Sequence, residues 1–191
     1  MKKLVRSDIL GPAGWADVRD QRRRAVIELK KLRRVSIGPQ VSLLFENRET
    51  MRVQVEEMCR AENLTSDDKI QDELEVYNAI LPDDGQLGAT LFIEMQSEVS
   101  MGRTLERLVG LQEHVWLVAG GHRIKAAFDP DQFRTDRLAA VQYLKFPLTP
   151  EAAEALRKPG TAVAVAVDHP NYRHSAQLDE AQRAEMASDL G

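Results

Sequence analysis

Hydrophobic residues recur at helical spacing through most of the first eighty residues. A first helix is predicted over residues 15–34 by apolar positions that alternate in steps of three and four. Its apolar stripe comprises Trp15, Val18, Ala25, Leu29 and Leu32, with Arg22 as an interruption. Two further helices are predicted over residues 48–62 and 66–80, and residues 41–45 form a short strand or a buried connector.

After a turn at residues 81–85 the apolar period changes from helical spacing to alternation, which is typical of strands. The predicted strands cover residues 88–95, 115–119, 122–128, 140–146 and 162–167. The pair Gly120-Gly121 supplies the positive φ angles of a two-residue hairpin turn. Ser97 and Thr149 are predicted helix caps, and a terminal helix is predicted over residues 179–190.

This order of elements predicts an α+β fold, with an N-terminal helical segment packed on a mostly antiparallel sheet of split βαβ-like layout. Residues 1–85 form the helical region and residues 86–191 the α+β sheet region, together one compact unit. The strand at 162–167 alternates alanine with valine, so we expect it to be central, with a helix packed on its alanine side.

Charge is distributed unevenly along the chain. Residues 1–34 hold eleven Lys or Arg against four Asp or Glu, a balance of +7, while the rest holds fifteen against twenty-six, a balance of −11. A basic end on an acidic body indicates either a basic contact surface or pairing within the molecule. No apolar run is long enough to span a membrane, and a single cysteine suits a reducing compartment, so we expect a cytoplasmic protein.

Motifs of several enzyme classes are absent from the sequence. It contains no phosphate loop, no dinucleotide-binding glycine turn, no nucleophile elbow and no paired-cysteine or H-E-x-x-H metal motif. The only cysteine, Cys59, lies beside the apolar edge of its predicted helix, which favours a small core residue over a nucleophile. The sequence leaves open whether the protein is an enzyme.

A cluster of potential metal ligands follows the alanine–valine strand. Asp168, His169 and His174 could hold a divalent cation such as zinc, iron or manganese if Pro170 turns the chain back on itself. A further ligand would then come from elsewhere, for example Glu94 or His122. The alternative is a hydrogen-bonded corner with two histidines that titrate near neutral pH.

Polar residues on the predicted helices suggest a second group of binding positions. Asn47 and Arg48 could bind an anion, although the residue type at position 47 favours a cap for the helix that follows it. Gln54 and Glu57 could line a polar cleft with Tyr77 and Asn78 from the next helix, or form an interhelical hydrogen-bond network.

The basic N-terminal helix has its own alternatives. Arg22, Arg23 and their basic neighbours suit phosphate groups, but aromatic or base-reading side chains are scarce beside them. This composition makes nucleic acid an unlikely partner and favours an acidic protein or a solvated helix surface.

Several short strings together resemble an uncharacterised bacterial domain-of-unknown-function family (family 3501). They are residues 35–39 (VSIGP), 45–50 (FENRET), 57–58, 60–62, 77–78, 167–170 (VDHP) and 172–174 (YRH). The resemblance transfers no catalytic residue. It implies a context, because members are often encoded beside rubrerythrin-like and iron–sulfur oxidoreductase-like genes, which points to oxidative stress or iron physiology.

These observations support one principal hypothesis and two alternatives. The principal hypothesis is a non-enzymatic accessory or binding protein that works with a redox partner such as a rubrerythrin or an iron–sulfur oxidoreductase. The alternatives are a metal-binding protein or metal-dependent enzyme centred on Asp168, His169 and His174, and nucleic-acid binding through the basic helix. Substrate, cofactor and oligomeric state are unknown at this point.

Overall fold

The structure is a computed structural model that describes residues 1–94, 98–129 and 138–191, with the side chains of residues 98–101 excepted. Its helices are α1 (Gly11–Arg33), α2 (Arg48–Ala61), α3 (Asp67–Ile80), α4 (Glu98–Arg107), α5 (Pro150–Arg157) and α6 (Glu180–Ser188), with 3-10 turns η1 (Arg6–Asp8) and η2 (Leu111–Glu113). Its strands are β1 (Arg34–Ile37), β2 (Val41–Glu46), β3 (Gln86–Ile93), β4 (Val115–Ala119), β5 (His122–Lys125), β6 (Ala127–Phe128), β7 (Val141–Pro147), β8 (Val163–His169) and β9 (Tyr172–Gln177).

The strands form two antiparallel sheets that enclose a common core. Sheet A has the order β1-β2-β3-β7-β6, and sheet B has the order β5-β4-β8-β9. At one edge the sheets share a bent segment, residues 122–128, which pairs with β4 and then with β7. At the bend, the N–H of Ala126 still donates to the carbonyl of Val115 at 2.9 Å. The inner faces of both sheets contribute to one apolar cluster, and this shared core fixes how the sheets lie against each other.

At the other edge, Tyr172 of β9 fastens sheet B to the turn between β1 and β2. Its hydroxyl donates to the carbonyl of Ile37 at 2.5 Å and accepts from the N–H of Gln40 at 3.0 Å. Gly38 in this turn has φ +74°, and a Cβ there would lie 2.5 Å from His174 Cγ. A glycine is therefore needed both for the backbone conformation and for the close approach of the β9 side chains.

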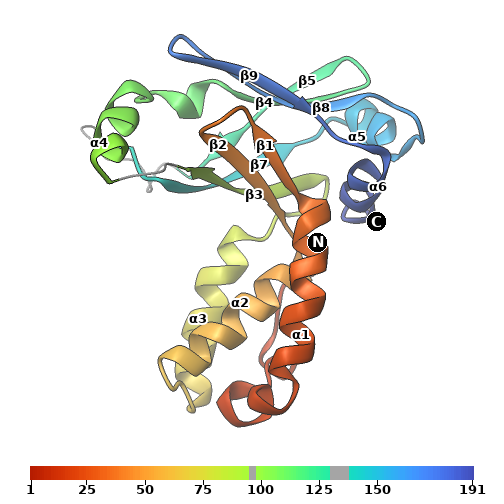
Figure 1. Cartoon of the computed structure of the whole chain (residues 1–191). Helices are drawn as coiled ribbons and strands as arrows, with labels where there is room; N and C mark the ends of the chain where they lie inside the picture. Colours follow the sequence, from red (N-terminus) through yellow and green to blue (C-terminus); the bar gives the residue numbers. More distant parts are fainter. Residues whose placement is uncertain (95–97, 130–137) are drawn as a thin grey trace.

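Helices α1, α2 and α3 extend away from sheet A as a separate layer (Figure 1). Buried side chains of α2 and α3 pack together, among them Met51, Val55, Cys59, Ile70 and Leu74. Between α1 and α2 lies a smaller cluster of Trp15, Val26 and Val53. The buried carboxylate of Glu56 accepts from the N–H groups of Leu10 at 2.6 Å and Gly11 at 3.2 Å, so α2 supplies the acceptor for the N-terminus of α1.

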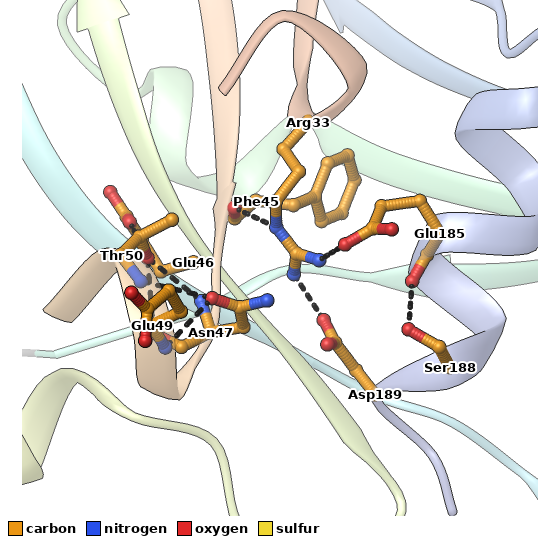
Figure 2. Close-up of polar contacts among 9 residues, drawn as sticks. All are labelled: Arg33, Phe45, Glu46, Asn47, Glu49, Thr50, Glu185, Ser188 and Asp189. Carbon is orange, nitrogen blue, oxygen red and sulfur yellow. Dashed lines mark hydrogen bonds and ion pairs between the residues drawn. The ribbon is translucent and has the colours of Figure 1, made fainter. Parts of the chain in front are cut away.

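A buried arginine joins the helical layer to the sheets and to the C-terminal helix (Figure 2). Arg33 is fully buried at the end of α1, and its Nε donates to the carbonyl of Phe45 in β2 at 2.8 Å. Its two terminal nitrogens bind Glu185, at 2.7 Å, and Asp189. Because two carboxylates and a carbonyl surround the guanidinium, its positive charge is compensated where water is excluded.

The burial of α1 differs from the predicted stripe. Ala25 and Leu32 are exposed, while Val26 and Arg33 are buried in their place. The helix starts at Gly11 and follows a period of 3.6 from Trp15, which brings position 26 and then position 33 to the inner side. The carboxylates that make burial of Arg33 possible lie on α6, so the local sequence pattern could not reveal them.

The α+β class is confirmed, whereas the split βαβ layout is replaced by two antiparallel sheets. The segments that contain α4 and α5 each carry the chain from sheet A to sheet B, so they connect two sheets and do not cross over within one. The valines of β8 are buried as predicted, but Ala164 and Ala166 on its other side are half-exposed, and the expected covering helix is not found in the described part of the chain. Strand β9 was not predicted.

Most element positions agree with the sequence prediction, including the hairpin of β4 and β5 across Gly120-Gly121. Thr149 caps α5 by accepting from the N–H of Ala152 at 3.3 Å. The predicted cap Ser97 and the strand end at Met95 lie outside the described residues. Within the described ranges, no helix combines the length and the apolar composition of a membrane span.

Candidate functional site

A cleft of about 550 Å³ lies between the C-terminal half of α3 and the strands β6 and β7 of sheet A. One wall comes from the helical layer and the other from sheet A, so the cleft is lined by residues that are far apart in the sequence. The lining residues are Val76, Ala79, Ile80, Gln86, Ala127, Phe128, Asp129, Tyr143, Leu144, Lys145 and Pro147. Clefts of this size and composition commonly hold small molecules.

The helical wall of the cleft is apolar and accessible. Val76 has 60 % of its surface exposed, more than any other large hydrophobic side chain of the described residues, and Ala79 is also exposed. On the opposite side of α3, Ile70 and Leu74 are buried against α2. Helix α3 therefore has a second apolar face, directed at the cleft, in addition to the face that builds the core.

The sheet wall adds polar groups at defined positions. Tyr143 and Lys145 are two residues apart on β7 and both line the cleft. Burial raises the pKa of the Tyr143 hydroxyl above its usual value, and the carboxylate of Glu46 raises it further, so the phenol is neutral and can donate. The ammonium of Lys145 lies 3.9 Å from Asp83, whose carboxylate also binds Lys3 at 3.3 Å. The cleft thus combines an apolar wall with a cation, a hydroxyl and the exposed carboxylate of Asp129.

Behind this wall, the buried carboxylate of Glu46 is fully satisfied by hydroxyl groups. Thr50 donates to it at 2.6 Å and Thr90 at 2.8 Å. Thr90 pairs directly with Tyr143 across β3 and β7. The network fixes the strand that carries Tyr143 and Lys145, which favours a preformed cleft.

The three predicted metal ligands do not converge on one point. Pro170 and Asn171 do turn the chain back, but as a tight hairpin in which Asp168 and His169 point to opposite faces of sheet B. The ring of His169 is held by backbone groups at both nitrogens, Val109 O at 3.1 Å and Asn171 N at 3.2 Å. His174 is exposed and stacks on Tyr172. Among the described residues no group of three or more His, Cys, Asp or Glu is arranged to hold a metal ion.

Asp168 instead belongs to a polar cluster on the outer face of sheet B. It accepts from the indole N–H of Trp116 at 3.0 Å, forms an ion pair with Arg123, and lies 3.2 Å from Nδ1 of His114. Burial acts to raise the pKa of Asp168, but these bonds together lower it below its usual value. Arg123 also stacks over the Trp116 ring at 3.8 Å. The sequence alone did not indicate His114, because its contact with Asp168 depends on the pairing of β4 with β8.

The other two suggested ligands lie in separate places. Glu94 binds Arg34 at 3.1 Å and also Ser42, on the outer side of sheet A. His122 is exposed at the start of β5, next to the glycine turn. Cys59 is buried in the helical core, and burial raises the pKa of its thiol to about 11, which makes it unreactive near neutral pH.

The two side chains of the suggested anion site at the start of α2 already have partners within the protein. The Oδ1 of Asn47 accepts from the N–H groups of Glu49 at 3.1 Å and Thr50 at 3.0 Å, so Asn47 is a helix cap. Arg48 forms an ion pair with Asp8. The two side chains therefore fasten α2 and do not jointly face an open space.

The suggested polar cleft between α2 and α3 is also divided among separate contacts. Glu57 binds Trp15 Nε1 at 2.8 Å and Arg19 Nε at 2.7 Å, and these bonds lower the pKa of Glu57 to about 2. Asn78 bonds both backbone groups of Leu4, at 2.8 and 2.9 Å. Gln54 forms a hydrogen bond with Tyr77. These contacts agree better with a hydrogen-bond network between the helices than with a polar cleft.

The basic residues Arg22 and Arg23 lie on α1 and are exposed. Arg22 approaches Glu49 of α2 at 4.0 Å, which is the limit of an ion pair. Arg23 is the next residue along α1 and therefore lies about 100° further around the helix than Arg22.

Comparison with known proteins identifies a family and a similar solved structure. Residues 3–190 match the family described as "Protein of unknown function (DUF3501)". The chain is similar to a crystal structure of a novel protein of unknown function from Burkholderia pseudomallei K96243, with 36 % identity, full coverage of both chains and a TM-score of 0.92. No curated protein matches the sequence.

Proposed function

The chain belongs to the DUF3501 family of proteins of unknown function, and from its own cleft we propose that it binds a small amphipathic molecule with an acidic head group. The carrying observation is the pairing of an exposed apolar helix face, Val76 and Ala79, with Lys145 on the opposite wall. An apolar body would lie along α3 and Phe128, and the acidic group would meet Lys145.

Physical chemistry supports this class of ligand. Covering apolar surface of the helix wall gives a favourable, non-directional contribution of roughly 25 cal/mol per Å². A carboxylate or phosphate beside Lys145 adds a charge-assisted hydrogen bond of about 1.5–3 kcal/mol. Tyr143 lies on the same face of β7 as Lys145, so its ring adds to the wall beside the head group.

Calorimetric titration with three probes of one chain length tests the proposal. Dodecanoate, dodecanol and dodecyltrimethylammonium share the apolar body and differ in head-group charge. We expect dodecanoate to bind about 10-fold more tightly than dodecanol, and the cationic probe to bind most weakly, because Lys145 is the cation of the cleft. Equal affinities for the three probes would contradict a role for Lys145 in ligand choice.

Two matched variants localise the binding. Ala79→Trp places an indole in the cleft from an exposed helical position, and Ala25→Trp makes the same change at an exposed position of α1. We expect the first variant to lose dodecanoate binding and the second to retain it. Retention by both variants would place the binding outside the cleft.

The role beside a redox protein, suggested by the family resemblance, stays a prediction. The same holds for nucleic-acid binding. Neither is needed for the cleft proposal, which depends only on the residues that line it.

A further inference from the structure

A second surface, independent of the cleft, lies on the outer side of α1. The inner side of the helix is buried through Trp15, Val26 and Arg33. Ile27 lies about 100° around the helix from Val26, on the solvent side, and has 49 % of its surface exposed. Exposed aliphatic side chains occur singly on most protein surfaces, so what distinguishes Ile27 is the set of charges around it.

The neighbours of Ile27 on the helix surface are all cationic. Arg23 and Arg24 precede it by four and three positions, and Lys30 and Lys31 follow it by three and four. Residues at these spacings surround a position on a helix surface. Ile27 is thus an apolar centre within a ring of four positive charges.

Most of this positive charge is not neutralised by the molecule itself. Lys31 binds Glu28 at 2.8 Å, but in the part of the chain that the structure describes no ion pair is formed by Arg23, Arg24 or Lys30. The rest of the chain is strongly acidic, yet its carboxylates pair with the other face of α1, as in Glu57 with Arg19. The ring around Ile27 therefore remains available to an external anion.

We propose that the outer face of α1, with Ile27 at its centre and Arg23, Arg24, Lys30 and Lys31 around it, docks an acidic protein segment that carries apolar residues. The charges complement the acidic segment and guide its approach, while an apolar side chain of the partner covers Ile27. An apolar centre within a polar rim is the usual anatomy of a protein interface.

The apolar centre favours a protein over a nucleic acid. Phosphate groups need only the cations, and bases are recognised by aromatic stacking or by donors and acceptors that contact base edges. Ile27 offers neither, and no aromatic residue occurs in α1 after Trp15, which is buried. An acidic peptide with interspersed apolar side chains can contact both the four cations and Ile27.

Two synthetic helical peptides provide the probe. Both are rich in glutamate, and they differ only in that a row of leucines in the first is replaced by serines in the second. Fluorescence anisotropy with the full chain should show at least about 10-fold tighter binding of the leucine peptide, with affinity that falls as salt rises. Equal binding of the two peptides, or no binding of either at low salt, would overturn the proposal.

Variants with matched controls locate the contact. Ile27→Ser should reduce the affinity for the leucine peptide to that for the serine peptide, whereas Val109→Ser, at a similarly exposed aliphatic residue away from α1, should not. The pair Arg23→Glu and Arg24→Glu should abolish binding of both peptides. The pair Lys158→Glu and Arg173→Glu changes the net charge equally at other exposed positions and should retain binding. Equal losses of peptide affinity in the two double variants would show that only the net charge of the protein matters.

Duplex and single-stranded DNA complete the experiment. If DNA binds more tightly than the leucine peptide and Ile27→Ser leaves that binding unchanged, the surface serves nucleic acid and the proposal is wrong. All substituted side chains are exposed, and unchanged melting temperatures would show that the variants are folded.

Discussion

Arg33 and Asp189 form an ion pair across 156 positions of sequence, with the guanidinium fully buried. Glu185, on α6, binds the same guanidinium, and the carbonyl of Phe45 accepts from its third nitrogen. This junction connects the end of the basic helix to the C-terminal helix (Figure 2). Arg33 is therefore one of the contacts that dock α6, beside the hydrogen bond of Arg183 to the carbonyl of Leu156 and the burial of Met186.

Removal of this arginine should be strongly destabilising. Arg33→Met leaves Glu185 and Asp189 as carboxylates without their cation, and we expect a loss of about 3–5 kcal/mol in the free energy of unfolding. Urea denaturation measures the loss. Arg34→Met, at the exposed neighbour, should cost less than about 1 kcal/mol. A similar effect of both changes would show that the junction contributes nothing specific.

We expect any side chain at position 38 to destabilise the fold, because the β9 side chains lie too close to Gly38. Gly38→Ala introduces strain at φ +74° and a collision with His174 and Tyr172, and we expect a loss of about 2–3 kcal/mol. Gly85 has nearly the same φ, +76°, but nothing within 4 Å of a Cβ. Gly85→Ala should therefore cost only about 1 kcal/mol, the price of the backbone conformation alone. Equal losses in thermal unfolding would refute the packing explanation.

The ion pair between Glu57 and Arg19 should make stability depend on acid. The pKa of Glu57 is lowered from 4.5 to about 2 in the folded protein, first by Arg19. Its stabilising contribution is therefore complete above pH 4.5 and is lost as the pH falls through that value toward 2. We expect this contribution to be about 1–2 kcal/mol, because the pair is partly exposed.

Urea denaturation at pH 5, 4 and 3 measures this dependence. Glu57→Gln should be less stable than the wild type at pH 5, and the difference should shrink toward pH 3. Glu75→Gln, at an exposed carboxylate of α3, should leave the wild-type profile unchanged. A constant difference between Glu57→Gln and the wild type across this range would contradict the assignment.

Sequence periodicity predicted most elements because each depends on local pattern. The caps at Asn47 and Thr149 and the hairpin at Gly120-Gly121 follow from short-range chemistry and are present in the structure. Strand β9 was missed because its sequence, YRHSAQ, is mostly polar. It is polar because β9 is an edge strand with one exposed face, and alternation there carries little hydrophobic contrast.

The candidate cleft could not be predicted, since its walls are far apart in sequence. Val76 and Ala79 fall outside the stripe that builds the core, so the pattern marks them only as exposed. Lys145 lies on β7, and only the antiparallel pairing of β3 with β7 and the folding of α3 over that sheet bring the two together. The predicted metal ligands failed for the converse reason. They are close in sequence, but alternation along β8 separates Asp168 from His169.

The most direct test of the cleft proposal is a titration of the isotope-labelled protein with dodecanoate, followed by amide chemical shifts in NMR spectra. The account predicts saturable shifts concentrated at Val76, Ala79, Phe128, Tyr143 and Lys145, with little change at the outer face of sheet B around Trp116 and Asp168. Shifts spread evenly over the surface, or centred away from α3 and β7, would contradict it.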